Sequence, residues 1–390
     1  MSLSMHPFPV PPPRSDVVDV RTLPRPQVPT VVRPRRSPEA AAGHGPVGAA
    51  PVVPAGSPDR GPVVLVTGSG GPAGVAVVRR LLALGHRVVA VDADPAAAGS
   101  ALAQVGVAVP RADAPGFVDA LVAVATEHAA GALISTVAEE LPALTAAADR
   151  LAAAGLATWL PDLAAVDLCC DKAAFAVCLS AAGVQHPATA ATTEGVADVP
   201  GPWIVKPRAG RGSRGVQLLD TAEAVTAAMT ADPALIAQTC LAGREFTADA
   251  LVGRDGALLT VVPRWRDVTR AGISVQGTTF ESEAVTAVVA NALTAVQLTG
   301  PANVQGFVAD DGTVTVVETN PRFSGGLPLT LAAGADVVAA YLAGVRDPGA
   351  ELPYLFFTPG VRMSRYFAET YTGPDGLPVD DPCTVAAVAG

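Results

Sequence analysis

A lysine followed by a glycine- and arginine-rich loop is the first part of this sequence that could do chemistry on phosphate. The apolar run 203–207 predicts a strand that delivers Lys206, and RAGRGSRG (208–215) follows it. Successive backbone N–H groups in such a loop can surround a polyphosphate, and a lysine offers its oxygens a compact charge. The GK[ST] ending of a Walker loop is missing. The pattern favours a phosphate-binding loop of another kind, with a solvated basic hairpin as the alternative.

Oxygen-bearing side chains gather on a second predicted element, a hairpin over 303–319. The Asp-Gly pair at 311–312 is a strong two-residue turn signal, and such a turn places Gln305 opposite Glu318, with Cβ atoms roughly 5 Å apart. Glu318 and Asn320 share a face because they are two residues apart on a strand. Oxygen ligands of this kind suit Mg²⁺, with phosphates completing its shell. The alternative is a polar hairpin end, although a carboxylate after the apolar run VTVV needs a partner.

Arginines provide a third possible site. Three of them surround Trp265 in the segment 264–274, and an arginine fork can clamp a carboxylate with two parallel hydrogen bonds. The alternative for each is an exposed loop arginine. The candidate substrate residues are Arg264, Arg270, Gly272, Arg362 and Arg365.

The first ordered region predicted by the sequence is a parallel sheet over residues 61–160. Apolar runs at 63–68, 87–95 and 131–137 alternate with helical segments, which is typical of an α/β domain. GSGGPAG follows the first run and resembles a dinucleotide-binding turn, but its glycine spacing is different and a proline interrupts it. A tight strand-to-helix turn is the favoured interpretation, and NAD binding is the alternative.

Outside this region the pattern changes twice. Strands and helices are mixed over 161–345, which predicts an α+β domain with a small lobe at about 180–240, and 346–390 form a C-terminal segment. Residues 1–60 hold 14 of the 36 prolines and cannot build a core. We expect these residues to form a disordered tail, or to lie upstream of the true start.

Together these motifs carry a resemblance to the ATP-grasp superfamily, nearest to ligases related to the large chain of carbamoyl phosphate synthetase. The resemblance covers about 63–345 and rests on DK, VKPRAGRGSRG, AGREF and VETNPRFSGG in the family's order. It implies a Rossmann-like pre-ATP-grasp domain followed by two lobes that hold ATP between antiparallel sheets. The only two lysines, Lys172 and Lys206, fall on the two expected basic positions.

The resemblance also implies roles for individual residues. Lys206 and Arg322 would act on the transferred phosphoryl group, and the metal ligands for Mg²⁺ would be Gln305, Glu318 and Asn320. Many relatives are acidic at 238 or 305, and the glutamine at 305 is a weaker ligand, which puts a second Mg²⁺ in doubt. The ATP-binding positions implied are Lys172, Lys206, Gly210, Arg211, Gly212, Ser213, Gln238, Leu241 and Glu245.

Composition narrows the class of protein. The 390 residues are 50% apolar with a mean hydropathy of +0.38, yet no uninterrupted apolar run is long enough for a membrane span. A net charge of −10 argues against general nucleic-acid binding. The five cysteines form no CxxC pair and no apolar leader follows the start, so a cytoplasmic location is expected.

The function predicted from these features is an ATP- and Mg²⁺-dependent ligase. It would form an acyl phosphate from a small carboxylate, such as an amino acid, and join the acyl group to an amine. Two alternatives are an enzyme that phosphorylates carbamate or bicarbonate and a non-catalytic nucleotide-binding protein. The expected partners are these small molecules, and a homodimer is left open.

Overall fold

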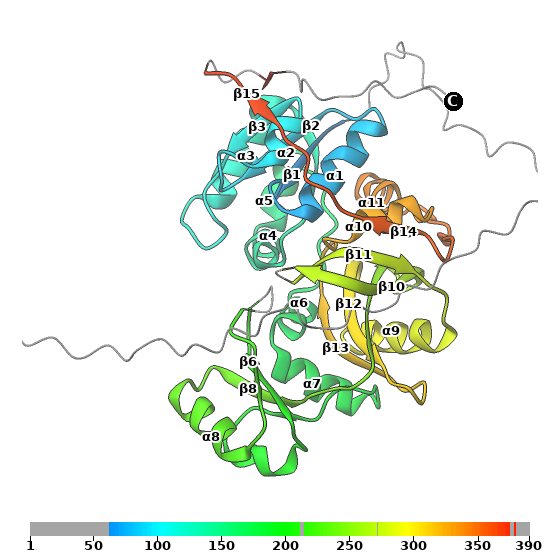
Figure 1. Ribbon diagram of the computed structural model, residues 1–390. Helices are drawn as coiled ribbons and strands as arrows, with labels where there is room; N and C mark the ends of the chain where they lie inside the picture. The colour runs from blue at the N-terminus through cyan, green and yellow to red at the C-terminus, as the bar shows by residue number, and fades with distance from the viewer. Residues whose placement is uncertain (1–61, 211–213, 271, 375–377, 380–390) are drawn as a thin grey trace, which may run out of the picture. The chain divides into compact units, whose positions relative to one another are not determined.

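The computed structural model describes residues 62–210, 214–270, 272–374 and 378–379 (Figure 1). The expected disordered tail, 1–60, lies outside the described residues. No helix in the described part of the chain combines the length and the apolar character needed to cross a membrane.

The first domain is built on a four-stranded parallel sheet with the strand order β3-β2-β1-β4. Successive residues of β1 point into different cores: Val64 and Val66 face one, Val63 and Leu65 the other. Both faces are therefore covered, which explains why the strand reads as a continuous apolar run. The elements are β1 (Val63–Thr67), α1 (Pro72–Ala83), β2 (Val88–Asp92), α2 (Ala98–Leu102), β3 (Val105–Ala108), α3 (Phe117–His128) and β4 (Ala130–Ser135).

Short helices connect this domain to the rest of the chain. Two of them, α4 and α5, are separated at Ala147, whose φ of −106° and ψ of 13° leave the helical range. The segments are η1 (Ala138–Glu140), α4 (Leu141–Ala146), α5 (Ala148–Ala153), α6 (Leu163–Cys170) and α7 (Lys172–Ala181).

A small antiparallel sheet with the order β5-β8-β6-β7 forms the next unit. One helix, α8, packs on it around the buried Val225 and Met229. Lys206 lies on its strand β6. Its elements are β5 (Thr189–Ala190), η2 (Glu194–Asp198), β6 (Trp203–Pro207), β7 (Gln217–Leu219), α8 (Ala222–Ala231) and β8 (Leu235–Thr239).

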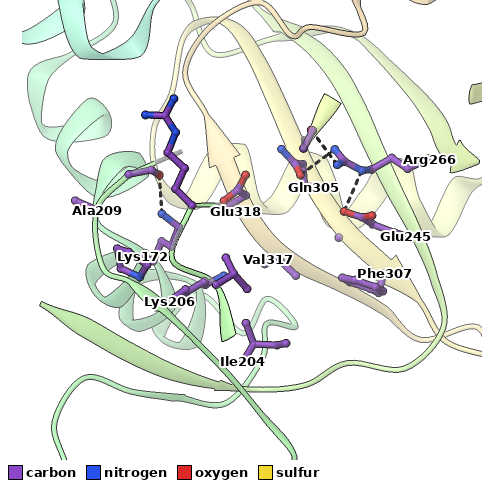
Figure 2. A pocket seen from close by; sticks show the side chains of 16 residues that line it. Lys172, Ile204, Lys206, Ala209, Glu245, Arg266, Gln305, Phe307, Val317 and Glu318 are labelled. Atoms are coloured by element: carbon purple, nitrogen blue, oxygen red, sulfur yellow. Dashed lines mark hydrogen bonds and ion pairs between the residues drawn. The ribbon is translucent and has the colours of Figure 1, made fainter. Parts of the chain in front are cut away.

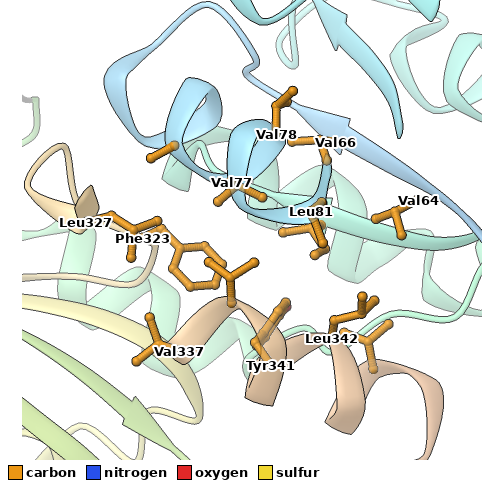
Figure 3. Close-up of a cluster of buried hydrophobic side chains, with 14 of the residues drawn as sticks. Val64, Val66, Val77, Val78, Leu81, Phe323, Leu327, Val337, Tyr341 and Leu342 are labelled. Carbon is orange, nitrogen blue, oxygen red and sulfur yellow. The ribbon is translucent and has the colours of Figure 1, made fainter. Parts of the chain in front are cut away.

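A six-stranded antiparallel sheet follows, in the order β13-β12-β9-β10-β11-β14. One of its faces packs against α6, α7 and α9, whereas Leu251 and Leu259 join the core that contains α1 and α11 (Figure 3). The elements are β9 (Arg244–Val252), β10 (Leu258–Arg270), β11 (Ile273–Thr279), α9 (Glu283–Ala295), β12 (Gly300–Val308), β13 (Val314–Asn320), α10 (Leu327–Ala332), α11 (Val337–Arg346), β14 (Arg362–Ser364), β15 (Tyr371–Thr372) and β16 (Pro378–Val379).

The predicted pairing of the hairpin strands is confirmed, although the turn differs from the predicted one. Gln305 does lie opposite Glu318. The turn is longer than the predicted two residues, since Val308 pairs with Val314 and five residues connect them. A register shift between Gln305 and Gly306 inserts one residue on the other strand and restores the predicted pairing. The two deviations cancel.

The predicted fold class, an α/β domain followed by a two-lobed α+β domain, is confirmed. The long strand β10 was not predicted, because the charged run RWRDVTR at its end lacks the alternation that identifies strands. In the predicted C-terminal segment, residues 362–364 form β14 and pair with β11.

Candidate active site

Lys206 lies on β6, an inner strand of the small sheet, and is 7% exposed. Burial lowers the pKa of its ammonium group to about 8; nearby Glu318 opposes this shift and Lys172 adds to it. Figure 2 shows Lys206 and Glu318 on strands that face each other across a pocket. A buried ammonium group needs a source of negative charge, and a bound phosphate would provide one.

The second lysine is held beside the first by an ion pair at the start of α7. The side chain of Asp171 caps this helix by accepting hydrogen bonds from the backbone N–H groups of Ala173 and Ala174. Arg208 donates hydrogen bonds to both carboxylate oxygens of Asp171, at 2.7 and 2.6 Å. The Lys172 ammonium group donates to the Gly210 carbonyl oxygen at 2.9 Å. The start of α7 and the start of the glycine-rich loop after β6 are therefore tied together, and both lysines line the pocket.

The large sheet contributes the oxygen-bearing side chains. Asn320 donates from Nδ2 to Oε1 of Glu318 at 3.1 Å, and Gln305 lies opposite Glu318 on β12. Among the described residues, no group of three or more His, Cys, Asp and Glu side chains is placed to hold a metal ion. One carboxylate with amide oxygens beside it suits Mg²⁺ only when phosphate oxygens complete the shell.

Arg266, on β10, joins several parts of the pocket wall. Its Nε lies 3.0 Å from Oε1 of Glu245, its Nη1 donates to Oε1 of Gln305 at 3.2 Å, and its Nη2 donates to the Gly272 carbonyl oxygen at 3.1 Å. Burial raises the pKa of the Glu245 carboxyl, Arg266 acts to lower it, and Glu318 acts to raise it. The guanidinium group thus contacts both Glu245, a predicted ATP-binding residue, and Gln305, a predicted metal ligand (Figure 2).

The pocket formed by these groups has a volume of about 200 Å³ and lies between the two antiparallel sheets. Apolar side chains from both sheets line it beside the charged ones, a mixture that suits a nucleotide with an apolar base and a charged phosphate chain. The lining residues are Lys172, Ile204, Lys206, Pro207, Ala209, Gly210, Arg214, Val216, Glu245, Arg266, Gly272, Gln305, Gly306, Phe307, Val317 and Glu318.

Other predicted ATP-binding residues do not line this pocket. Gln238 is buried in β8, where its side chain donates to Thr189 at 3.0 Å, and Leu241 lies in the connection between β8 and β9. The predicted loop residues 211–213 (Arg211, Gly212 and Ser213) lie outside the described residues.

Arg322 and Asn320 lie just beyond the lining residues. Arg322 donates to the carbonyl oxygen of Phe323 at 2.9 Å and to the side-chain oxygen of Asn320 at 3.4 Å. Arg322 therefore continues the chain of polar contacts that begins at Glu318.

The predicted substrate arginines have different environments. Arg264 is buried and forms an ion pair with Asp249 at 2.7 Å, and a Cβ at Gly326 would overlap its guanidinium group. Arg365 is half-buried and donates to the carbonyl oxygens of Ser274 and Gly325. Arg270 and Arg362 are exposed, and of the five predicted positions only Gly272 lines the pocket.

Two pocket cations, Arg214 and Arg266, were not among the candidate residues. Arg266 belongs to the arginine segment that the sequence singled out, but only the pairing of β10 with β9 and β11 shows which of its arginines faces the pocket. Arg214 lies near the end of the glycine-rich loop 208–215, so the sequence of this loop could have identified it as a candidate.

Comparisons with known proteins agree with this architecture. Residues 64–158 match the family model of the PylC-like N-terminal domain, and 231–363 match that of ATP-grasp in the biosynthetic pathway with Ter operon. No curated protein sequence matches the chain.

Solved structures share the fold at low identity. Biotin carboxylase from Campylobacter jejuni is 17% identical with a TM-score of 0.62, covering 77% of this chain and 75% of its own. N5-carboxyaminoimidazole synthetase from Staphylococcus aureus, complexed with ADP, is 15% identical with a TM-score of 0.60, covering 76% and 80%. L-amino acid ligase from Bacillus licheniformis is 18% identical with a TM-score of 0.56, covering 74% and 75%. The predicted resemblance to the ATP-grasp superfamily is confirmed, since an ATP-grasp family model matches residues 231–363 and these structures share the fold.

Proposed function

We propose that this protein is an ATP- and Mg²⁺-dependent ligase that activates a small carboxylate as an acyl phosphate and joins it to an amine. The observation that carries the proposal is the position of Lys206 and Glu318. They come from different sheets, 112 positions apart in the sequence, and line one pocket. A buried cation opposite a carboxylate and amide oxygens is the arrangement that a metal-bound triphosphate requires.

The cations of the pocket would neutralise the transferred phosphoryl group. Phosphoryl transfer needs little covalent chemistry from the protein, so its rate depends on positioning and on charge stabilisation. Lys172 and Lys206 would contact the phosphate oxygens from the small-sheet side. Arg322 would approach from the end of β13, where its contact with Asn320 orients it. The substrate carboxylate oxygen then attacks the γ-phosphorus, ADP leaves, and an amine displaces phosphate from the acyl group.

Glu318 and Asn320 would hold Mg²⁺. When bound, the ion would neutralise phosphate charge and fix the orientation of the chain of phosphates. The protein's part is to place the two side chains on alternate residues of β13, where Nδ2 of Asn320 donates a hydrogen bond to Oε1 of Glu318.

The acid would lie near Arg365. This guanidinium group is half-buried, and its hydrogen bonds among the described residues go to the carbonyl oxygens of Ser274 and Gly325. Carbonyl oxygens do not neutralise a positive charge, so the site favours a substrate carboxylate. Arg264 is not included, because Asp249 already balances its charge.

The L-amino acid ligase named above supports an amino acid as the substrate. A second candidate is bicarbonate, since the biotin carboxylase domain of Hydrogenobacter thermophilus 2-oxoglutarate carboxylase, 17% identical with a TM-score of 0.61, was solved with MgADP and bicarbonate. The screen below therefore includes bicarbonate among the acids.

The test is a screen for ADP and phosphate release over pairs of acids and amines. We expect release that requires one particular pair, and a loss of about 100-fold or more in Glu318→Ala, because a metal ligand is removed. Glu127→Ala removes an exposed carboxylate on α3 and is the matched control, which should retain full activity. Equal rates in Glu318→Ala and Glu127→Ala would reject the assignment of Glu318.

A further inference from the structure

The side-chain oxygen of Gln305 already has a cationic partner. Its Oε1, the atom that would have to bind a metal, accepts a hydrogen bond from Nη1 of Arg266 at 3.2 Å. The amide nitrogen of Gln305 faces Asn303, to whose side-chain oxygen it donates at 3.4 Å. The amide therefore presents its oxygen to a guanidinium group. The side-chain oxygen of Asn320 has a longer contact of this kind, 3.4 Å to Nη2 of Arg322, whereas Arg266 is also held by Glu245 and by the carbonyl oxygen of Gly272.

Arg266 is fixed in this position. Its side chain is 9% exposed, and it contacts Glu245, Gln305 and the carbonyl oxygen of Gly272. These contacts come from the neighbouring strand β9, from β12 and from the connection between β10 and β11. A buried guanidinium group held at several points keeps its charge at one place in the pocket, as a bound ion would.

The charges around the pocket favour one metal ion rather than two. Its lining includes the cations Lys172, Lys206, Arg214 and Arg266, and the anions Glu245 and Glu318, for a net charge of +2 from these side chains. ATP with one Mg²⁺ retains about two negative charges, which this lining balances. A second Mg²⁺ would leave the nucleotide nearly neutral in a positively charged site.

We propose that Arg266 takes the place of a second metal ion on the nucleotide's phosphates, so that this protein uses one divalent cation per ATP. The inference rests on the proposed function, since it assumes that the pocket binds ATP. Glu318 and Asn320 hold the single ion, and Gln305 positions Arg266 instead of binding metal. The side-chain oxygen of Gln305, which could bind a second metal ion, instead accepts a hydrogen bond from the guanidinium group of Arg266.

The test counts metal ions in the wild-type protein. Mn²⁺ is titrated in the presence of a saturating β,γ-imido analogue of ATP, and bound Mn²⁺ is measured from the electron paramagnetic resonance signal of the free ion. Binding of the analogue is measured separately by calorimetry. One tightly bound Mn²⁺ per bound nucleotide is the expected result. Two of comparable affinity would overturn the inference and leave the proposed function intact, whereas no binding of the analogue would reject the proposed function itself.

Variants test the role of the charge at 266. Arg266→Gln should weaken analogue binding by about tenfold or more, and Arg266→Lys should restore part of the loss. The matched control is Arg244→Gln, which removes an arginine that pairs with Asp267 and lies outside the pocket lining. Replacing Gln305 by Glu together with Arg266→Gln should create a second Mn²⁺ site. Equal analogue affinities for Arg266→Gln and Arg244→Gln would overturn the inference.

Discussion

Arg264 and Arg266 stand two residues apart on β10, and each has a carboxylate partner, but their surroundings differ. Arg264 lies in a closed network: Asp249 pairs with it, Ser324 accepts its hydrogen bond at 3.0 Å, and Gly326 covers it. Arg266 lines an open pocket that has more cations than anions. Buried or partly buried charges therefore occur in this protein in two settings, a closed network and a ligand pocket. A buried charge that is balanced within the protein is costly only when its partner is removed, whereas an excess of one charge around a pocket indicates where a ligand of opposite charge binds.

The largest expected effect comes from breaking the closed network. Asp249→Ala leaves Arg264 buried without its carboxylate, and it also removes the acceptor of Thr330 and a partner of Asn303. Because an unpaired buried charge is costly, the free energy of unfolding should fall by about 3–5 kcal/mol. Urea denaturation measures this loss. A loss below about 1 kcal/mol would show that Arg264 can be rehydrated and that the network is not closed.

A smaller effect is expected at Glu140, a buried carboxyl in the first domain. It accepts hydrogen bonds from Thr67 and Ser135, yet burial raises its pKa to about 7. The folded protein therefore binds the Glu140 proton more tightly than the unfolded chain does. This contribution to stability is full below pH 4.5 and is lost as the pH rises to about 7.

Glu140→Gln should remove that dependence. The free energy of unfolding is measured at pH 5 and at pH 8. The difference between the two values should be about 2–3 kcal/mol smaller in the variant than in the wild type. Glu127→Gln, an exposed carboxylate, is the control and should behave as the wild type. Parallel pH profiles for Glu140→Gln and the wild type would contradict the assignment of a raised pKa to Glu140.

A third prediction concerns the unbalanced charge of Lys206. Its pKa of about 8 means that the ammonium group loses its proton in mildly basic solution. Affinity for an ATP analogue should therefore be constant below pH 8 and then fall by at most about tenfold per pH unit. Lys206→Arg keeps its charge throughout this range, so any binding it retains should lose this pH dependence. A profile that is flat to pH 10 in the wild type would contradict the prediction.

The smallest effect on stability is expected for Arg266→Gln. Its Glu245 partner is 35% exposed, so losing the ion pair should change the free energy of unfolding by about 1 kcal/mol or less. The same urea series that includes Asp249→Ala measures it. A loss as large as that of Asp249→Ala would remove the distinction between the two arginines.

The sequence predicted the fold and part of the candidate site because these depend on local patterns. The apolar runs predicted the parallel sheet, and the order of the motifs predicted that Lys206 and Glu318 converge. The different roles of Arg264 and Arg266 could not be predicted in this way. They depend on how β10 pairs with β9 and on the loop that covers only one of the two arginines, and both are long-range features.

The central claim is that a metal-bound triphosphate lies between Lys206 and Glu318, and calorimetry with the β,γ-imido analogue of ATP tests it most directly. Wild-type protein should bind one nucleotide per chain in the presence of Mg²⁺, and Lys206→Met and Glu318→Gln should each weaken binding by about tenfold or more. Wild-type affinity in both variants would contradict the claim.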